Sequence, residues 1–246
     1  MNSDVLILIP ARMASTRLPG KPLADIGGVP MIVRVMRRAE AAAVGPVVVA
    51  AGDPEIAEAV AAAGGRAVLT DPDLPSGSDR ILAALEEIDP DGRHDVVLNV
   101  QGDMPFVAPQ TLVACVALAA QTGCDIATVV APEASAQDRA NPDVVKAVLA
   151  LQADGRRGRA LYFTRSTLHG DGAVLRHIGL YGYRREALVR FHAAPPSPLE
   201  LREKLEQLRA MELGLTIWAA VVDEAPISVD NPADLERARQ YARGLS

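Results

Sequence analysis

The sequence predicts an α/β fold with a mostly parallel central sheet and helices on both faces. Aliphatic runs suited to buried strands alternate with amphipathic, helix-like segments between residues 5 and 100. The first run is VLILI, over residues 5–9, and the last is DVVLNV, over 95–100. Strands that are apolar along most of their length are typical of parallel sheets covered on both faces. Such sheets bind ligands beyond the C-terminal ends of their strands.

Residues that start and stop helices place the elements between these two runs. Asp53 is expected as the N-cap of a helix with Pro54 at its first position, and Gly64 is expected to end it. We therefore predict, in order, a helix from Met31, a strand over 46–51, a helix over 55–63, a strand over 66–70 and a helix over 79–88.

The second half of the chain has a less regular pattern. It predicts strands over 125–130, 144–151, 178–183 and 216–222, a long helix over 198–213, and a final helix over 233–243. Because there is no internal repeat and no long linker, we expect one domain spanning residues 1–246. A small inserted sub-structure around 155–200 accounts for the irregular part.

Composition and charge narrow the class of protein. Hydrophobic residues make up 49% of the chain and aromatic residues only 3%, so the core is expected to be aliphatic. The net charge of −6 argues against a nucleic-acid or anionic-membrane partner. Cys115 and Cys124 match no zinc-site spacing and are expected to be buried thiols in a reducing compartment. No signal peptide or membrane span is predicted, so we expect a cytoplasmic protein.

A basic loop follows the first predicted strand. The segment IPARMASTRLPGKPL, residues 9–23, carries Arg12, Arg17 and Lys21 but no acid. Three cations in one bent loop repel each other unless an anion lies between them. The loop is not a Walker A motif, since Pro22 follows the lysine, and it lacks the dinucleotide fingerprint. We interpret it as a clamp for a di- or triphosphate; an ordinary solvated loop is the alternative.

Two carboxylates are candidates for one edge of the sheet, and a serine-rich turn is a separate candidate for ligand binding. Asp103 comes just after the strand over 95–100, and Asp230 follows the late strand over 216–222. Mg²⁺ is commonly held by one or two carboxylates together with substrate phosphates, so their meeting would form a metal site. A turn or helix-cap role is the alternative for Asp103. The turn PSGSDR, residues 75–80, suits a base edge or a phosphate, or serves as a plain helix cap.

Polar and aromatic side chains gather in the second half. The segments LYFTRSTL and RHIGLYGYR bring Arg165, His177, Tyr181 and Tyr183 close to predicted strands. An arginine such as Arg165 can bind a carboxylate through two hydrogen bonds. Histidine and tyrosine on strands are more often structural. Glu206 with Gln207 could bind sugar hydroxyls or lie on a solvated helix face.

The chain resembles the 3-deoxy-D-manno-octulosonate (Kdo) cytidylyltransferases, the CMP-Kdo synthetase family. The resemblance is carried by motifs in family order between residues 9 and 238: IPARMASTRLPGKPL, PSGSDR, NVQGDMP, ALYFTR, RHIGLYGYR, SPLELREKLEQLR and VDNPADLER. RHIGLYGYR and SPLELREKLEQLR also distinguish the chain from the related sialic-acid cytidylyltransferases, which share mainly the first loop.

This resemblance implies a Rossmann-like, glycosyltransferase-A-like nucleotidyltransferase fold, a homodimer formed through the inserted sub-structure, and a role in lipopolysaccharide assembly. It implies that CTP and Kdo react with Mg²⁺ to give CMP-Kdo and pyrophosphate. The catalytic residues carried over by motif position are Arg12, Lys21, Asp103 and Asp230, the two aspartates being the metal ligands. The nucleotide-binding residues are Ala11, Arg12, Lys21, Ser76, Gly77, Arg80 and Gln101. The sugar-binding residues are Gln101, Arg165, His177, Tyr181, Glu206 and Gln207.

Two departures from the family pattern leave alternatives open. Many members have Glu-Pro after the QGD, where this chain has Met104 and Pro105. After ALYFTRST many continue Ile-Pro, whereas this chain reads LHGDG over 168–172, which predicts a short loop over the sugar pocket. Transfer to 8-amino-Kdo or a sialic acid is therefore an alternative. A non-catalytic nucleotide-binding dimer is another; it predicts loss of Lys21 or of an aspartate, and all are present.

Overall fold

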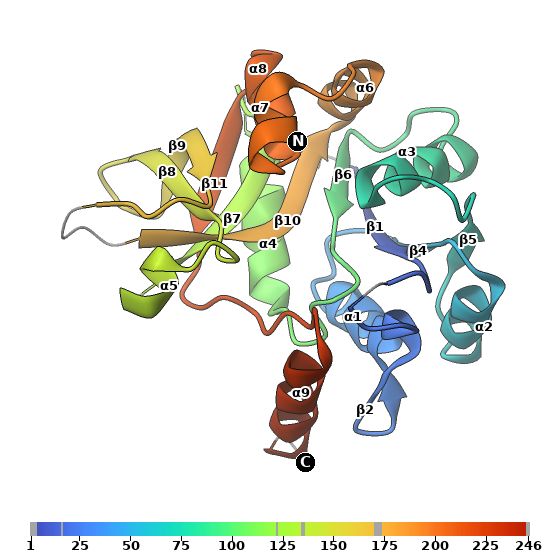
Figure 1. Ribbon diagram of the computed structural model, residues 1–246. Helices are drawn as coiled ribbons and strands as arrows, with labels where there is room; N and C mark the ends of the chain where they lie inside the picture. Colours follow the sequence, from blue (N-terminus) through green and yellow to red (C-terminus); the bar gives the residue numbers. More distant parts are fainter. Residues whose placement is uncertain (1–3, 16, 122, 134–135, 170–173, 245–246) are drawn as a thin grey trace. The chain divides into compact units, whose positions relative to one another are not determined.

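The computed structural model describes residues 4–244 except residues 16, 122, 134–135 and 170–173 (Figure 1). Its contacts divide the chain into two compact units, Met1–Leu112 with Pro226–Ser246, and Val113–Ala225. The expected single domain with a sub-structure around 155–200 stays a prediction.

The first unit contains a parallel sheet in the order β5-β4-β1-β6. Its strands are β1 (Val5–Ala11), β4 (Val47–Ala51), β5 (Ala67–Leu69) and β6 (Val96–Asn99). All residues of β1 are buried, and Ile9 lies beside Val49 in the register. The predicted run of buried parallel strands is therefore confirmed in this unit, because an apolar strand needs cover on both faces.

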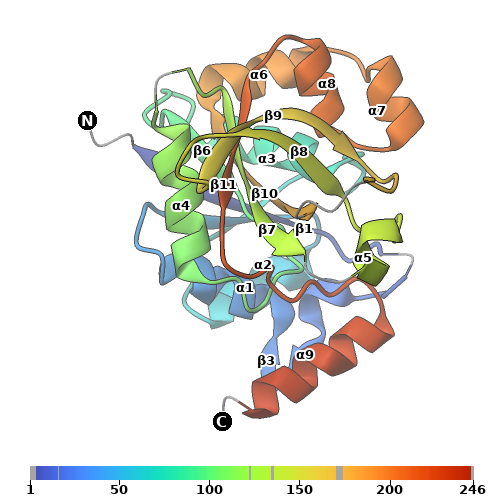
Figure 2. The same ribbon diagram turned by 90° about the vertical axis from the view of Figure 1, so that its left-hand side faces the viewer.

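The helices of the first unit come from both ends of the chain. They are η1 (Lys21–Leu23), α1 (Met31–Glu40), α2 (Pro54–Ala62), α3 (Gly77–Ile88) and α9 (Pro232–Gly244), beside a hairpin of β2 (Asp25–Ile26) and β3 (Val29–Pro30). Both ribbon views place α9 along the hairpin (Figures 1 and 2). Leu235 and Ala238 of α9 pack with Ile26 and Met31 in one apolar cluster, which also contains Val229. This packing holds the C-terminal segment against the N-terminal unit.

The second unit contains a mixed sheet in the order β10-β7-β11-β9-β8. The elements of this half are α4 (Pro109–Ala119), β7 (Ile126–Glu133), α5 (Ala136–Ala140), β8 (Lys146–Leu151), β9 (Arg157–Thr164), β10 (Val174–Arg184), α6 (Arg185–Ala193), α7 (Pro198–Glu203), α8 (Gln207–Glu212) and β11 (Ile217–Val221). Among the described residues of this sheet, β7 and β11 pair in parallel and the other neighbouring strands pair antiparallel. The sequence pattern did not predict α4 or β9 as elements.

The predicted long helix over 198–213 is wrong, because two short helices replace it. Lys204 has a left-handed backbone, with φ +54°, and separates α7 from α8. The nitrogen of the next residue, Leu205, then bonds to the carbonyl of Glu200 at 3.3 Å. Leu205 is buried. Amphipathic spacing alone did not reveal this break, since it does not interrupt the helical pattern.

A second correction concerns Asp53, which we expected to cap α2. Its side chain makes no capping bond to that helix. Its carboxylate instead accepts a hydrogen bond from the backbone nitrogen of Met13 at 2.7 Å, which ties down the basic loop. The predicted stop at Gly64 is confirmed by its left-handed φ of +81°.

Both cysteines are buried, as predicted, and neither forms a disulfide. Burial raises the pKa of the Cys115 thiol and raises that of Cys124 to about 12. Both thiols therefore stay protonated and unreactive near neutral pH. None of the helices in the described part of the chain is both long enough and apolar enough to cross a membrane.

Candidate active site

A cavity of about 360 Å³ lies in the first unit, beyond the C-terminal ends of β1 and β6. Its wall is formed by Pro10, Ala11, Arg12, Ala14, Ser15, Arg17, Lys21, Pro22, Ser76, Gly77, Arg80, Gln101, Gly102 and Asp103. The structure thus brings all of the expected nucleotide-binding residues to one cavity. Their position at the strand ends is where an open parallel sheet binds its ligand.

Lys21 lies between two carboxylates in this site. Its Nζ is 2.8 Å from Oδ2 of Asp103 and 3.3 Å from Oδ1 of Asp230. These partners lie 82 and 209 positions away in sequence. The Lys21 side chain is only 16% exposed, so the pair of contacts is largely shielded from water. The predicted meeting of the two aspartates is therefore present.

The same contacts correct the expectation that the basic loop lacks acidic partners. Lys21 is paired twice, and Arg17 places Nη2 3.3 Å from Oδ1 of Asp230. Arg12 donates to the carbonyl of Leu74 at 3.3 Å. The acids could not be found by inspecting the loop, because they come from the ends of two distant segments.

The local backbone structure holds Lys21, Asp103 and Asp230 in place. Gly20 has a left-handed φ of +69° and turns the chain into η1, which begins at Lys21. A Cβ on Gly102 would lie 2.9 Å from the carbonyl oxygen of Pro10, so only glycine lets this turn approach the end of β1. The nitrogen of Asp230 donates to Asp234 in the first turn of α9 at 3.0 Å. The cluster is held by backbone as well as by charge.

The carboxylates of Asp103 and Asp230 are suitable ligands for a hard divalent cation. Burial raises the pKa of the Asp103 carboxyl, while the charge and hydrogen bond of Lys21 oppose that rise. In this structure Lys21 and Arg17 balance the charges of the two carboxylates. Among the described residues there is no group of three or more His, Cys, Asp or Glu side chains for a metal. Mg²⁺ matches this set, since it takes one or two carboxylates and completes its shell with phosphates and water.

Arg80 lines the cavity, and its guanidinium already donates hydrogen bonds to other residues of the protein. Its guanidinium donates to Oγ1 of Thr70 at 2.6 Å and to the carbonyls of Asp71 and Pro72 at 2.9 and 3.2 Å. The residue is 1% exposed, and burial lowers its pKa. Arg80 therefore supports the loop beneath the cavity, in addition to any contact with a nucleotide.

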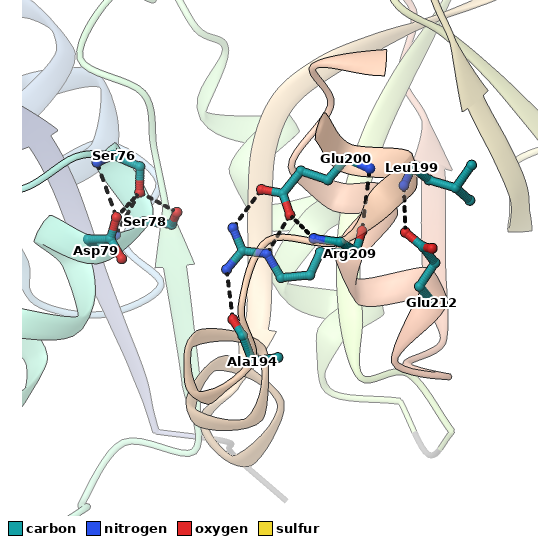
Figure 3. Close-up of polar contacts among 9 residues, drawn as sticks. Ser76, Ser78, Asp79, Ala194, Leu199, Glu200, Arg209 and Glu212 are labelled. Atoms are coloured by element: carbon teal, nitrogen blue, oxygen red, sulfur yellow. Dashed lines mark hydrogen bonds and ion pairs between the residues drawn. The ribbon is translucent and has the colours of Figure 1, made fainter. Parts of the chain in front are cut away.

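The N-terminus of α3 also faces this cavity through Ser76 and Gly77. Ser76 and Asp79 form a capping box, in which each side chain bonds to the backbone nitrogen of the other at 3.1 Å (Figure 3). Oγ of Ser78 lies 3.0 Å from Oγ of Ser76. The helix-cap interpretation of Ser76 is thus confirmed, and the capped helix directs the positive end of its dipole toward the cavity wall.

The second unit contains a continuous row of rings, which we call the aromatic row. It runs through Phe163, His177, Tyr181, Tyr183 and Phe191, with successive centroids 5.0, 5.4, 5.7 and 6.3 Å apart. Burial, and then the charge of Glu206, raise the pKa of the Tyr181 hydroxyl, so it remains a hydrogen-bond donor. The structure thus brings together His177, Tyr181 and Glu206, three of the expected sugar-binding residues.

The other expected sugar-binding residues differ in their surroundings. Gln207 is only 7% exposed, and its Nε2 makes no hydrogen bond to any described residue. A buried donor without an acceptor costs roughly 1–3 kcal/mol, so this amide suits a bound ligand. Arg165 donates to the carbonyl of Pro142 at 3.1 Å. Gln101 belongs to the first unit, where its Nε2 donates to Asn99 at 3.1 Å.

An ion pair between Glu200 and Arg209 supports the residues after the helix break (Figure 3). Nε of Arg209 is 2.7 Å from Oε2 of Glu200, and Nη2 bonds to the other carboxylate oxygen. The guanidinium lies 4.5 Å from the ring centroid of Phe191. Nine residues of a straight helix rise about 13.5 Å, so this contact requires the break at Lys204. The sequence analysis missed this pair, although the motif SPLELREKLEQLR contains both residues.

The chain matches the family model of the cytidylyltransferases over residues 6–217. A solved structure described as CMP:2-keto-3-deoxy-manno-octonic acid synthetase complexed with CTP is 36% identical, with a TM-score of 0.90 over 99% of this chain and all of that chain. A 4-diphosphocytidyl-2C-methyl-D-erythritol synthase from Anaerococcus prevotii shares the fold, with a TM-score of 0.67 at 11% identity over 99% of this chain and all of that chain. The chain therefore belongs to the class of α/β cytidylyltransferases.

Curated relatives narrow this class. The 3-deoxy-manno-octulosonate cytidylyltransferase of Parvibaculum lavamentivorans is 61% identical over 95% of this chain and 91% of its own length. That of Methylobacterium radiotolerans is 58% identical over 98% of both chains. The chain belongs to the 3-deoxy-manno-octulosonate cytidylyltransferase family.

We predict that the Glu200–Arg209 ion pair stabilises the second unit. Glu200→Gln leaves a shielded guanidinium without its charged partner and should lower the free energy of unfolding by roughly 2 kcal/mol. Glu212→Gln is the matched control, because Glu212 accepts a bond from the nitrogen of Leu199 at 3.1 Å in an exposed position. It should change stability by less than about 0.5 kcal/mol. Urea unfolding followed by the fluorescence of Trp218 measures both; equal midpoints for the two variants would contradict the prediction.

Proposed function

We propose that this chain transfers CMP from CTP to the anomeric hydroxyl of Kdo, releasing pyrophosphate and forming CMP-Kdo for lipopolysaccharide assembly. The observation that carries this proposal is the cavity beyond β1 and β6, which is lined by the basic loop, the N-terminus of α3 and Asp103, with Asp230 paired to Lys21 of its wall. Relatives about 60% identical bear the name of this activity.

The reaction is an in-line displacement at the α-phosphorus of CTP. The anomeric hydroxyl at C2 of Kdo gives up its proton to water, its oxygen forms the new bond to phosphorus, and the bond to pyrophosphate breaks. Arg12 and Lys21 neutralise charge on the phosphates, and three N–H donors let Lys21 follow the leaving group. The protein acts by positioning and by charge, without a covalent intermediate.

We propose that Asp103 and Asp230 hold Mg²⁺ when CTP is bound. Held by these two carboxylates, the metal would supply positive charge to the phosphates. In the structure Lys21 occupies both carboxylates, so binding of Mg²⁺ and CTP requires the lysine to exchange these partners for phosphate oxygens. The lysine keeps the two carboxylates together until the substrate arrives.

Lys21→Met should raise the affinity for Mn²⁺ in the absence of nucleotide at least about tenfold, because among the described residues it removes the one cation that contacts both carboxylates and leaves only the exposed Arg17 beside Asp230. Product formation should fall at least about a hundredfold, since a donor to the phosphates is lost. Electron paramagnetic resonance of free Mn²⁺ measures the binding. Lys21→Met combined with Asp230→Asn is the control and should lose the gained affinity. An affinity in Lys21→Met no higher than in the wild type would contradict the exchange.

The substrate is tested by Mg²⁺-dependent pyrophosphate release. We expect release with CTP and Kdo, and little with UTP or ATP, or with a sialic acid in place of Kdo. Pyrophosphate release with 8-amino-Kdo but not with Kdo would leave the proposed fold and cation site unchanged and would identify 8-amino-Kdo as the acceptor sugar. Retained CTP binding without release for any of these sugars would favour the non-catalytic alternative.

We propose that the chain is a homodimer formed through its second unit. Leu151 of β8 and Leu161 of β9 are exposed on strands that pair with each other. A contiguous exposed apolar surface marks an interaction site, and we propose that these two leucines belong to one. Light scattering should give twice the mass of 25.9 kDa for the wild type and the mass of one chain for Leu161→Asp. A monomeric wild type would contradict the proposal.

A further inference from the structure

Thr128 is a fully buried hydroxyl at the centre of the second unit's sheet. It lies on β7, opposite Tyr181, where β10 has an irregular register between Ile178 and Tyr181. Its Oγ1 lies 2.8 Å from the carbonyl oxygen of Leu180 and 3.3 Å from that of Ile178. It also lies 3.0 Å from Nε2 of His177. The irregular register turns these three groups toward one hydroxyl.

Counting protons decides the direction of each bond. A threonine hydroxyl has one proton to donate, and carbonyl oxygens can only accept. If that proton pointed at His177, both carbonyl oxygens would face the lone pairs of Oγ1 with no hydrogen between them. Thr128 is 0% exposed, so water does not relieve such a contact. The hydroxyl therefore donates to the nearer carbonyl, that of Leu180, and accepts from Nε2–H of His177.

His177 consequently carries its proton on Nε2 and has a bare lone pair on Nδ1. Burial lowers the pKa of His177 to about 3, so the ring is neutral at working pH. The ring lies between Phe163 and Tyr181 in the aromatic row, with centroids 5.0 and 5.4 Å away. A neutral ring in this tautomer offers one hydrogen-bond acceptor to its surroundings and no further donor.

We propose that Thr128 is a positioning residue that holds His177 in the Nε2–H tautomer, so that Nδ1 accepts a hydrogen bond from a hydroxyl of the acceptor sugar. This inference rests on the proposed role of His177 in the sugar site. It assigns that role a direction: the histidine recognises a group that donates a proton, such as a sugar hydroxyl. A carbonyl or carboxylate oxygen at the same place is disfavoured, because two acceptors then face each other.

The first test is the nitrogen spectrum of ¹⁵N-histidine-labelled protein. The wild type should show a protonated Nε2 and an unprotonated Nδ1 for His177. Thr128→Val keeps the shape but removes the hydroxyl and should release the ring into a mixture of tautomers, whereas Thr128→Ser should keep the wild-type spectrum. A protonated Nδ1 in the wild type would overturn the inference, whether or not the valine variant folds.

The second test separates the sugar from the nucleotide. Thr128→Val should raise the KM for Kdo about tenfold, the effect of one lost hydrogen bond, while kcat and the KM for CTP change less than twofold. Thr111→Val, at a buried threonine of α4, is the matched control and should leave both KM values unchanged. A KM for CTP that rises as much as that for Kdo would overturn the positioning role, because it indicates general damage.

The variant His177→Phe distinguishes this inference from the function on which it rests. It should raise the KM for Kdo at least as much as Thr128→Val does. An unchanged KM in His177→Phe, with the expected spectrum in the wild type, would overturn the ligand contact while the tautomer stands. Wild-type protein that forms no CMP-sugar would overturn the proposed function itself, a result independent of the spectrum.

Discussion

The contact on which the rest of the first unit depends is the ammonium of Lys21 between Asp103 and Asp230. Three like-charged side chains in a tight loop destabilise it unless negative charge lies nearby. The fold supplies that charge from the end of β6 and from the segment before α9. The C-terminal helix returns to the hairpin and packs there through Leu235 and Ala238, which keeps Asp230 in reach of the loop.

This arrangement links stability to chemistry. The largely buried ammonium of Lys21 forms ion pairs with two carboxylates that otherwise repel each other. The site is therefore already assembled before a ligand binds. In the proposed exchange, Lys21 moves from the carboxylates to the phosphates and Mg²⁺ takes its place at the carboxylates. This exchange needs only side-chain movement, because Gly20, Gly102 and α9 fix the backbone. A preassembled site loses little ordering entropy when substrate binds, which favours fast in-line displacement.

Much of the first unit could be predicted from its sequence, because buried parallel strands and helix caps leave local patterns. The strand over residues 5–9 and the helix cap at Ser76 follow from patterns among neighbouring residues. Contacts between distant segments leave no such pattern. The break at Lys204, the bond from Met13 to Asp53, and the hydroxyl of Thr128 beneath His177 all depend on tertiary partners. The basic loop is visible in the sequence and lines the cavity, yet its acidic partners do not lie within it.

The most direct measurement is a crystal structure with CTP and Mn²⁺, in which anomalous scattering locates the metal. We expect manganese bound to both Asp103 and Asp230, with Nζ of Lys21 moved from the carboxylates to a phosphate oxygen. Manganese bound elsewhere, or Lys21 still holding both aspartates with CTP in the cavity, would contradict the central role given to this lysine.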